Sequence, residues 1–380
     1  MRIGLLAGKY APDPGGLAVS ARRLARGLQE AGHEVVVYVP GDALLPGQRG
    51  QTADDGIVVW RFGLHKRADD THVDWFEGVV QLHEERPFTL LHAYYLAGAG
   101  QVAVYAARYL GIPSIVSARG NDLERSALDP AQTGGIVWAL ARAGAVTAVS
   151  HDLAQKAKAL ADCHPIVIHN GVDANLFTPA PPDAALRAEL GLKPDTPVLG
   201  FVGEARLKKG LTILLPAFAQ VAAQAEAAGQ PIPALLLIGG VRKDNKDIVR
   251  VFKAQNPTLK VRVIDNVAHA DLPRYYNLLD INLLPSLRDG LPNSLLEGLA
   301  CGKATIATRV GGMLDVLEHG VNGWLIAPGD VAELVEAIGR LLAAGEERER
   351  VGRNGRQTIL AHFTPEQELQ ANLSLYKALK

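Results

Sequence analysis

The chain has 380 residues, of which 48% are apolar and 21% charged, a composition that supports folded cores and argues against disorder. Its 39 Lys and Arg residues balance 40 Asp and Glu residues, so the charge favours neither a nucleic acid nor an anionic membrane as partner. The cysteines, Cys163 and Cys301, are too few for a disulfide framework, and without a signal-peptide pattern or a bilayer-spanning apolar run we expect a cytoplasmic protein.

Short β-like runs alternate with helical patterns along the first half of the chain, which is typical of βαβ units and a parallel sheet. The predicted strands are Ile3–Ala7, Glu34–Val39, Ile57–Phe62, Thr89–His92, Ser114–Ser117, Val146–Val149 and Ile166–Ile168. Amphipathic helices are predicted between them, for example over Leu17–Ala31, Ala97–Leu110 and His151–Ala161. The segment Ala53–Gly56 is predicted to be a turn rather than a metal-binding pair of carboxylates. The proline-rich segment Thr178–Asp183 predicts a linker.

The same alternation restarts after Pro197. The predicted strands are Val198–Val202, Ala234–Ile238, Val261–Ile264, Ile281–Leu284, Thr305–Ala307 and Trp324–Ile326. The predicted helices are Leu211–Ala228, Pro292–Cys301, Met313–Glu318, Val331–Ala344 and Glu346–His362. Thr364 followed by Pro365 predicts the N-cap and first residue of a last helix.

We therefore predict two doubly wound, Rossmann-like α/β domains of parallel sheet. The first covers residues 1–178, a linker covers 179–196, the second covers 197–362, and a C-terminal helix over 363–380 crosses back to the first domain. Ligands of open α/β sheets bind at the carboxyl ends of the strands, so we expect the two domains to face a central cleft.

The segment 286–302 carries the strongest functional signal. It places Asp289 before a glycine turn and Glu297 in an otherwise apolar helix that is predicted to begin near Pro292. A buried charge needs a polar partner, and a helix start offers N–H groups to an anion. Glu297 lies roughly 7 Å along the helix, so it faces a different part of a ligand from Asp289. This favours an elongated nucleotide sugar over the two carboxylates of a glycosidase, with a structural salt bridge at Glu297 as the alternative.

In this interpretation Glu297 accepts hydrogen bonds from ribose hydroxyls and Asp289 reaches the transferred sugar. The backbone expected to approach the diphosphate is that of Gly290, Leu291, Pro292 and Asn293.

Two loops that follow strands are further candidates. Gly15 and Gly16 allow backbone to approach a ligand at a helix start, without the three-glycine spacing of a dinucleotide site, and a plain tight turn is the alternative. Arg206 and Lys209 offer a planar fork and a point charge to phosphate oxygens, and a solvated basic loop is the alternative.

His92 and His151 are interpreted as structural or capping residues rather than catalytic bases. Along the whole sequence, no group of residues has the spacing that is typical of metal ligands.

The ordered motifs resemble those of the retaining GT-B-fold glycosyltransferases of family 4, the group 1 glycosyl transferases. The matching segments are Gly15–Gly16, Val149–Ser150, Ile168–Asp173 with Phe177, Phe201–Gly203 with Lys209–Gly210, Asp289–Glu297, Gly311–Gly312 and Asn322–Gly323. The resemblance implies that the first domain binds the acceptor and the second the nucleotide. It also implies that Gly16, Arg206 and Lys209 meet the diphosphate, that Glu297 meets the ribose, and that the enzyme needs neither metal nor bound cofactor.

Three residues depart from the pattern of that family. Asp289 replaces a glutamate and is one methylene shorter. Glu204 stands where an arginine is usual, and Arg206 is expected to take its place. Arg119 replaces a histidine that lies near the donor sugar, and it is suited to a phosphate or to a charged group on donor or acceptor. The residues expected to act in catalysis are Asp289, Arg119, Arg206 and Lys209.

We thus expect an enzyme that moves a hexose-type sugar from a UDP- or GDP-linked donor to an acceptor hydroxyl with retention of configuration, in glycan or glycoconjugate biosynthesis. The alternatives are another GT-B enzyme, such as a sugar-nucleotide epimerase or a phosphorylase, and a non-catalytic sugar-nucleotide-binding protein.

The acceptor is expected to be a sugar, a lipid-linked molecule or a small molecule, bound by loops over 42–55, 64–72 and 124–133. Arg22, Arg23 and Arg26 share a helix, where a solvated face is favoured over contact with a membrane surface.

Overall fold

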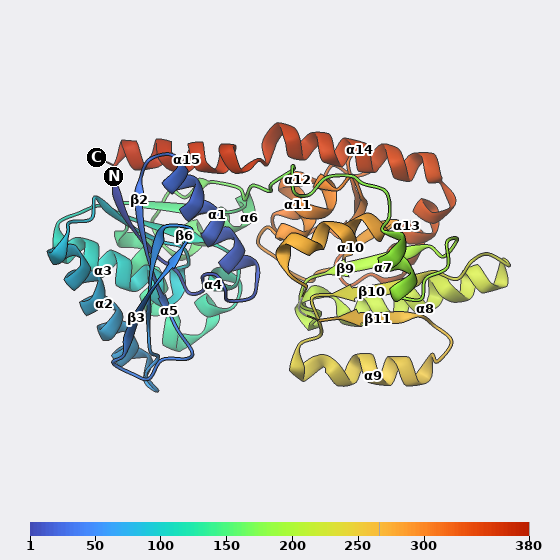
Figure 1. Cartoon of the computed structure of the whole chain (residues 1–380), viewed down its shortest axis with the longest axis horizontal. Helices are drawn as coiled ribbons and strands as arrows, with labels where there is room; N and C mark the ends of the chain where they lie inside the picture. The colour runs from blue at the N-terminus through green and yellow to red at the C-terminus, as the bar shows by residue number, and fades with distance from the viewer. Residues whose placement is uncertain (266, 380) are drawn as a thin grey trace. The chain divides into compact units, whose positions relative to one another are not determined.

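The computed structural model describes residues 1–265 and 267–379 of the chain. The chain forms two compact units: an N-terminal unit, Met1–Gly171 together with Pro365–Lys380, and a C-terminal unit, Val172–Thr364. Each unit is an α/β fold built on its own doubly wound, mainly parallel sheet (Figure 1). The predicted fold class is therefore confirmed for both.

The N-terminal unit has an eight-stranded sheet in the order β3-β4-β2-β1-β5-β6-β7-β8. Its strands are β1 (Arg2–Leu6), β2 (Glu34–Pro40), β3 (Arg49–Asp54), β4 (Ile57–Phe62), β5 (Leu90–Ala93), β6 (Ser114–Ala118), β7 (Ala145–Ala148) and β8 (Ile166–Val167). Its helices include α1 (Gly16–Glu30), α2 (Ala68–Glu85), α3 (Gln101–Leu110), α4 (Asn121–Glu124), α5 (Pro130–Arg142), α6 (His151–Leu160) and α15 (Pro365–Ala378).

Strand β3 corrects the prediction of a loop over 42–55. It pairs antiparallel with β4 through a tight turn at Asp55 and Gly56, both of which have positive φ. Such turns match the twist of the strands that they join. The sequence signal was weak because β3 is a polar edge strand, with three of its residues exposed. The segments 64–72 and 124–133 likewise contain the starts of α2 and α5 rather than loops alone.

The core of the N-terminal unit follows the periods of its elements. Apolar side chains at alternate positions of β1 and β2 pack against Ala21, Leu24, Ala25 and Leu28 of α1, which recur at helical spacing. Leu373, Leu375 and Tyr376 of α15 join the same cluster. The last helix (red in Figure 1) therefore packs beside α1 in this unit.

Glu368 fastens α15 to this unit. Its buried carboxylate accepts hydrogen bonds from Arg23 Nε at 2.7 Å, Gly171 N at 2.9 Å and Tyr94 Oη at 3.3 Å. We expect Glu368→Gln to lower the free energy of unfolding by about 3 kcal/mol, because the substitution removes the buried negative charge to which Arg23, Gly171 and Tyr94 donate. Urea unfolding checks this result. Glu366 is exposed in the same turn, so Glu366→Gln is the matched control. Equal effects of the two substitutions would contradict the role of Glu368 in fastening α15.

The C-terminal unit has a six-stranded, fully parallel sheet in the order β11-β10-β9-β12-β13-β14. Its strands are β9 (Val198–Val202), β10 (Ala234–Ile238), β11 (Val261–Ile264), β12 (Ile281–Leu284), β13 (Ala304–Thr308) and β14 (Trp324–Ile326). Its helices include α7 (Ala184–Glu189), α8 (Leu211–Ala227), α9 (Lys246–Gln255), α10 (Leu272–Leu278), α11 (Asn293–Ala300), α12 (Met313–Val316), α13 (Val331–Ala343) and α14 (Gly345–His362). All strands except β13, which is longer, have the predicted bounds.

Helices cover both faces of this sheet. Apolar residues of α8, α9 and α13 pack in one cluster with alternate residues of the strands, while α11 and α14 pack against each other and against β13. Helix α7 lies inside the range 179–196 that was predicted to be a linker. Asp183 caps it by accepting from Leu186 N at 2.9 Å, and Leu186 is buried, so this segment is an ordered part of the C-terminal unit.

Among the helices in residues 1–265 and 267–379, none is both long enough and apolar enough to cross a membrane.

Candidate active site

The C-terminal unit has a topological switch point between β9 and β12. From β9 the chain winds outward through β10 and β11, and it then returns to the other side of β9 to form β12, β13 and β14. The connections that leave β9 and β12 thus run in opposite directions, and the crevice between the carboxyl ends of two such strands is where open α/β sheets bind ligands. The loops that follow β9, β12 and β13 lie at this end of the sheet.

Two glycines allow these loops to touch. A Cβ at Gly210 would lie 1.8 Å from the carbonyl oxygen of Pro285, and one at Gly311 would lie 1.7 Å from that of Asp289. Both residues also have positive φ, so a side chain is excluded by space and by backbone conformation. The main-chain bond from Leu287 N to Lys208 O, 2.8 Å long, joins the loops after β9 and β12.

Lys209 and Asp289 form an ion pair across the crevice: Lys209 Nζ donates to Asp289 Oδ2. Only 17% of the Lys209 side chain and 12% of the Asp289 side chain are exposed. Burial of Asp289 favours its neutral form, but the charges of Lys209 and Lys208 and the hydrogen bond from Lys209 outweigh it and lower the pKa of Asp289. Asp289 is therefore an anion that holds Lys209 at the mouth of the site.

We expect Asp289→Asn to destabilise the protein by about 1–3 kcal/mol near neutral pH, because the buried Lys209 ammonium loses its counter-ion. The pKa of Asp289 is lower in the folded than in the unfolded chain, so its contribution is present above the ordinary aspartate value of 3.8 and disappears as the pH falls through the lower, folded value. Urea midpoints of both proteins as a function of pH test this expectation. The exposed Asp247→Asn is the control, and a wild-type advantage that persists at the acid end would contradict it.

Arg206 lies on the same loop and pairs with Glu204, its Nη1 lying 3.3 Å from Glu204 Oε2. Within the described part of the chain, Nε of Arg206 is buried and makes no hydrogen bond. A buried unpaired N–H is costly, so this donor is available to an acceptor such as a phosphate oxygen. Glu204, one of the three departures noted in the sequence, is thus the partner of Arg206.

Glu297 is the fifth residue of α11 and is 7% exposed, as its apolar neighbours predicted. Tyr276 Oη donates to its Oε2 at 2.8 Å, and His269 Nε2 lies 3.1 Å from its Oε1. The ring of Phe177 packs edge-on against both His269 and Tyr276. The structure therefore contains the contacts of the salt-bridge alternative, while a carboxylate has further lone pairs with which to accept from hydroxyls.

No spacing along the chain points to His269 or Tyr276, because they precede β12 and reach Glu297 only through the fold.

The start of α11 lies in the same crevice. Pro292 is its N-cap, and no described side chain caps it. Gly290, Leu291 and Pro292 are buried, and Gly290 O accepts a hydrogen bond from Gly312 N at 2.5 Å. This turn is thus supported by the loop after β13, and the helix dipole there favours an anion.

The predicted glycine turn of the N-terminal unit is also braced by a side chain that sequence reasoning missed. Gly15, with φ 114°, is the N-cap of α1, and Gly16 is its first residue. Arg61 of β4 donates to the carbonyls of Tyr10 and Ala11, each at 2.9 Å, and pairs with Asp13 at 3.1 Å. A charge from a neighbouring strand therefore holds this loop in place.

Arg119 follows β6, and its guanidinium is fixed on two sides. It donates to Asn170 Oδ1 and lies 4.0 Å over the ring of Tyr94. Its main-chain N–H, together with three neighbouring N–H groups, donates to the carboxylate of Asp122, whose burial raises its pKa. Asp122 shapes the turn that presents Arg119, and the sequence had not indicated this role.

The histidines behave largely as predicted. His92 is buried between Tyr376 Oη at 2.6 Å and Ser117 Oγ at 2.7 Å, and burial lowers its pKa to about 3, so it is a neutral structural residue. His151 is the exposed first residue of α6, where Ser150 is the N-cap.

The three arginines considered for membrane contact are engaged in ion pairs within the N-terminal unit. Arg22 pairs with Asp54, Arg26 with Asp55, and Arg23 with Glu368. Carboxylates of β3, its turn and α15 meet these arginines, so they form no unpaired basic patch, while the side chains of Arg22 and Arg26 remain 38% and 44% exposed to solvent.

The two doubly wound sheets, with polar loops gathered at the switch point of the second, define an α/β protein of the GT-B class. The family model Glycosyl transferases group 1 matches residues 183–358, and the model Glycosyltransferase Family 4 matches residues 14–176. The chain therefore belongs to family 4 of the GT-B glycosyltransferases, as its motifs predicted.

Known proteins resemble the chain over almost its whole length. N-acetyl-alpha-D-glucosaminyl L-malate synthase of Bacillus anthracis is 23% identical over 374 residues, which are 96% of this chain and 94% of that protein. The structure of sucrose-phosphate synthase from Thermosynechococcus elongatus matches with a TM-score of 0.84 at 22% identity, over 100% and 98% of the two chains. Alr3699/HepE of Anabaena in complex with UDP-glucose matches with a TM-score of 0.83 at 21% identity, over 100% of both chains. These structural matches confirm the fold.

Proposed function

We propose that this glycosyltransferase moves a hexose-type sugar from a UDP- or GDP-linked donor to an acceptor hydroxyl with retention of anomeric configuration. The observation that carries the proposal is the set of charged groups at the carboxyl ends of β9 and β12. There two cations, Arg206 and Lys209, lie on the loop after β9, and the loop after β12 leads to the start of α11 and the buried Glu297. This sequence of groups matches the order of sugar, diphosphate and ribose in a nucleotide sugar.

In this proposal the protein acts mainly by positioning and by charge. Lys209, Arg206 and the backbone at the start of α11 stabilise the negative charge that develops on the leaving diphosphate, and Glu297 orients the ribose. Asp289 acts near the sugar through Lys209. Two side-chain cations supply the charge that a metal ion supplies in other transferases, so we propose a metal-independent reaction, and excess EDTA is expected to leave turnover unchanged.

A thermal-shift screen of UDP, GDP and ADP and their sugars tests the proposal, because a ligand that binds the native state raises the melting temperature. Release of nucleoside diphosphate that requires an acceptor, together with NMR of the product anomer, then identifies the reaction. Release to water alone or phosphorolysis without nucleotide would favour the epimerase or phosphorylase alternative. Binding without turnover of any donor would favour a non-catalytic protein.

We further propose that the acceptor carries an anionic group that Arg119 binds. Two of the similar proteins have a malate and a sugar phosphate in their names. We expect Arg119→Gln to raise KM for an anionic acceptor by roughly 10–100-fold, the cost of one charge-assisted contact. A panel of malate, hexose phosphates and neutral sugars measures this effect. The exposed Arg108→Gln is the control, and an unchanged KM would contradict the assignment.

A further inference from the structure

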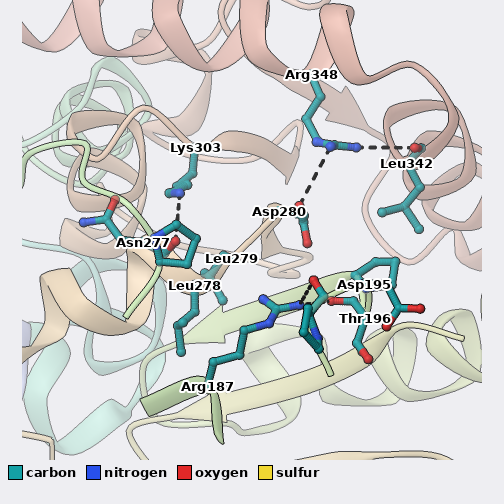
Figure 2. A pocket seen from close by; sticks show the side chains of 13 residues that line it. Arg187, Asp195, Thr196, Asn277, Leu278, Leu279, Asp280, Lys303, Leu342 and Arg348 are labelled. Atoms are coloured by element: carbon teal, nitrogen blue, oxygen red, sulfur yellow. Dashed lines mark hydrogen bonds and ion pairs between the residues drawn. The ribbon is translucent and has the colours of Figure 1, made fainter. Parts of the chain in front are cut away.

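A cavity of about 390 Å³, shown from close by in Figure 2, lies at the amino ends of strands in the C-terminal sheet. Its walls include Pro197, directly before β9, Asp280, directly before β12, and Lys303, directly before β13. All strands of this sheet are parallel, so these are amino ends of strands, whereas Lys209 and Asp289 lie beyond carboxyl ends. The cavity is within the range of about 300–1,000 Å³ that is typical of small-molecule sites.

Three cationic side chains, Arg187, Lys303 and Arg348, line this cavity. In Figure 2 they come from three separate parts of the chain: α7, the turn before β13, and α14. Lys303 is largely buried, and burial lowers the pKa of its ammonium because the charge has lost part of its hydration. A bound anion would restore what the ammonium lost.

Each cation keeps donors that the protein does not use. Arg187 donates through Nε and Nη2 to carbonyls, and Arg348 donates through Nη1 to the carbonyls of Leu341 and Leu342. Among the described residues, Nη1 of Arg187 and Nε of Arg348 make no hydrogen bond, and Lys303 Nζ makes one, to Asn277 O at 3.3 Å. The carbonyl contacts fix the two guanidinium groups in place, so the remaining donors are preorganised.

The carboxylates of the lining do not neutralise this charge. Asp280 accepts from Val198 N at 2.7 Å, and its other oxygen lies 3.8 Å from Arg348 Nη2. Asp195 is exposed at the rim. Three cations against two carboxylates leave an excess of one positive charge.

We propose that this cavity binds a phosphate group, carried by a small phosphate monoester or present as free phosphate, at Lys303, Arg187 and Arg348. A tetrahedral oxyanion accepts from several directions at once, and these three cations reach the cavity from three separate elements. The site is separate from the nucleotide-binding crevice, and the proposal does not depend on which donor the enzyme uses.

Calorimetric titration of the full chain with glycerol 3-phosphate and with inorganic phosphate, at constant ionic strength in sodium chloride, tests the proposal. We expect saturable binding that Lys303→Gln weakens by about tenfold or more, since it removes a charge-assisted contact. Two controls are expected to bind phosphate as the wild type does. One is Lys253→Gln, which makes the same change of charge at an exposed position of α9, and the other is Lys209→Ala. Tighter binding of the monoester identifies a phosphorylated small molecule as the ligand, and equal or tighter binding of inorganic phosphate identifies the free ion.

Asp195→Asn provides a second variant at an exposed position, in case Lys303→Gln does not fold. Removing its negative charge is expected to strengthen phosphate binding about threefold. Any of three results would overturn the proposal. The wild type binds no phosphate, Lys209→Ala abolishes the binding, or neither Lys303→Gln nor Asp195→Asn changes the affinity. A nucleotide response that survives in Lys303→Gln keeps this test distinct from that of the active site.

Discussion

Lys209→Ala is expected to lower kcat/KM for the nucleotide-sugar donor by roughly 10²–10³-fold, with most of the loss in kcat. The reason is that Lys209 offers a point charge to the diphosphate in a partly buried crevice, where charge that develops during bond cleavage is poorly screened by water. Steady-state rates of nucleoside-diphosphate release measure the effect.

Two control variants separate this catalytic role from the structural one. Lys209 also neutralises Asp289, so its removal leaves a buried carboxylate unpaired and lowers stability. The double variant Lys209→Ala with Asp289→Asn removes that penalty and is expected to regain stability but not rate. Lys253→Ala on exposed α9 is expected to have wild-type kinetics. Full recovery of rate in the double variant would contradict a direct role of Lys209 in catalysis.

Glu297→Ala is expected to weaken binding of the nucleoside diphosphate by about 10–100-fold, because two hydrogen bonds from ribose hydroxyls to a buried carboxylate disappear. Calorimetry with UDP and with GDP measures the loss without any need for an acceptor. The 2′-deoxy nucleotide provides the matched ligand. We expect the wild type to bind it more weakly than the ribonucleotide, and we expect Glu297→Ala to bind the two nucleotides with equal affinity.

The partners of Glu297 provide the protein control. Tyr276→Phe removes one hydrogen bond to Glu297 but leaves its charge in place, so its effect on nucleotide affinity is expected to be smaller than that of Glu297→Ala. If Tyr276→Phe weakens binding as much, or if Glu297→Ala binds as wild type does, then Glu297 is a structural residue, as its contacts with Tyr276 and His269 also allow.

The regular part of the fold was predictable because it depends on local periodicity. Strands β9, β10 and β14 of the C-terminal unit are continuous apolar runs next to a Gly or a Pro, and buried parallel strands favour such runs. The position of Glu297 in a short apolar helix was predictable for the same reason. Elements without a clear apolar pattern were missed. Strand β3 is a polar edge strand, and α7 follows a proline-rich segment that resembles a linker.

The contacts inside the site were not predictable from spacing. Asp289 meets Lys209 and Glu297 meets His269, over separations of 80 and 28 residues. Which side chains meet is decided by the order of strands in the sheet, and above all by the return of the chain from β11 to β12. The partnership of Glu204 with Arg206 likewise appears only once the loop after β9 is folded.

The proposed function requires the crevice between β9 and β12 to hold the nucleotide of the donor. A crystal structure of the chain grown with the nucleoside diphosphate that stabilises it best would show where the nucleotide binds. We expect the ribose hydroxyls within hydrogen-bond distance of Glu297 and the diphosphate on Lys209, Arg206 and the first residues of α11. A nucleotide bound elsewhere, for instance in the cavity at the amino ends of the strands, with Glu297 in contact with Tyr276 and His269 and not with the ribose, would show that this crevice is not the donor site.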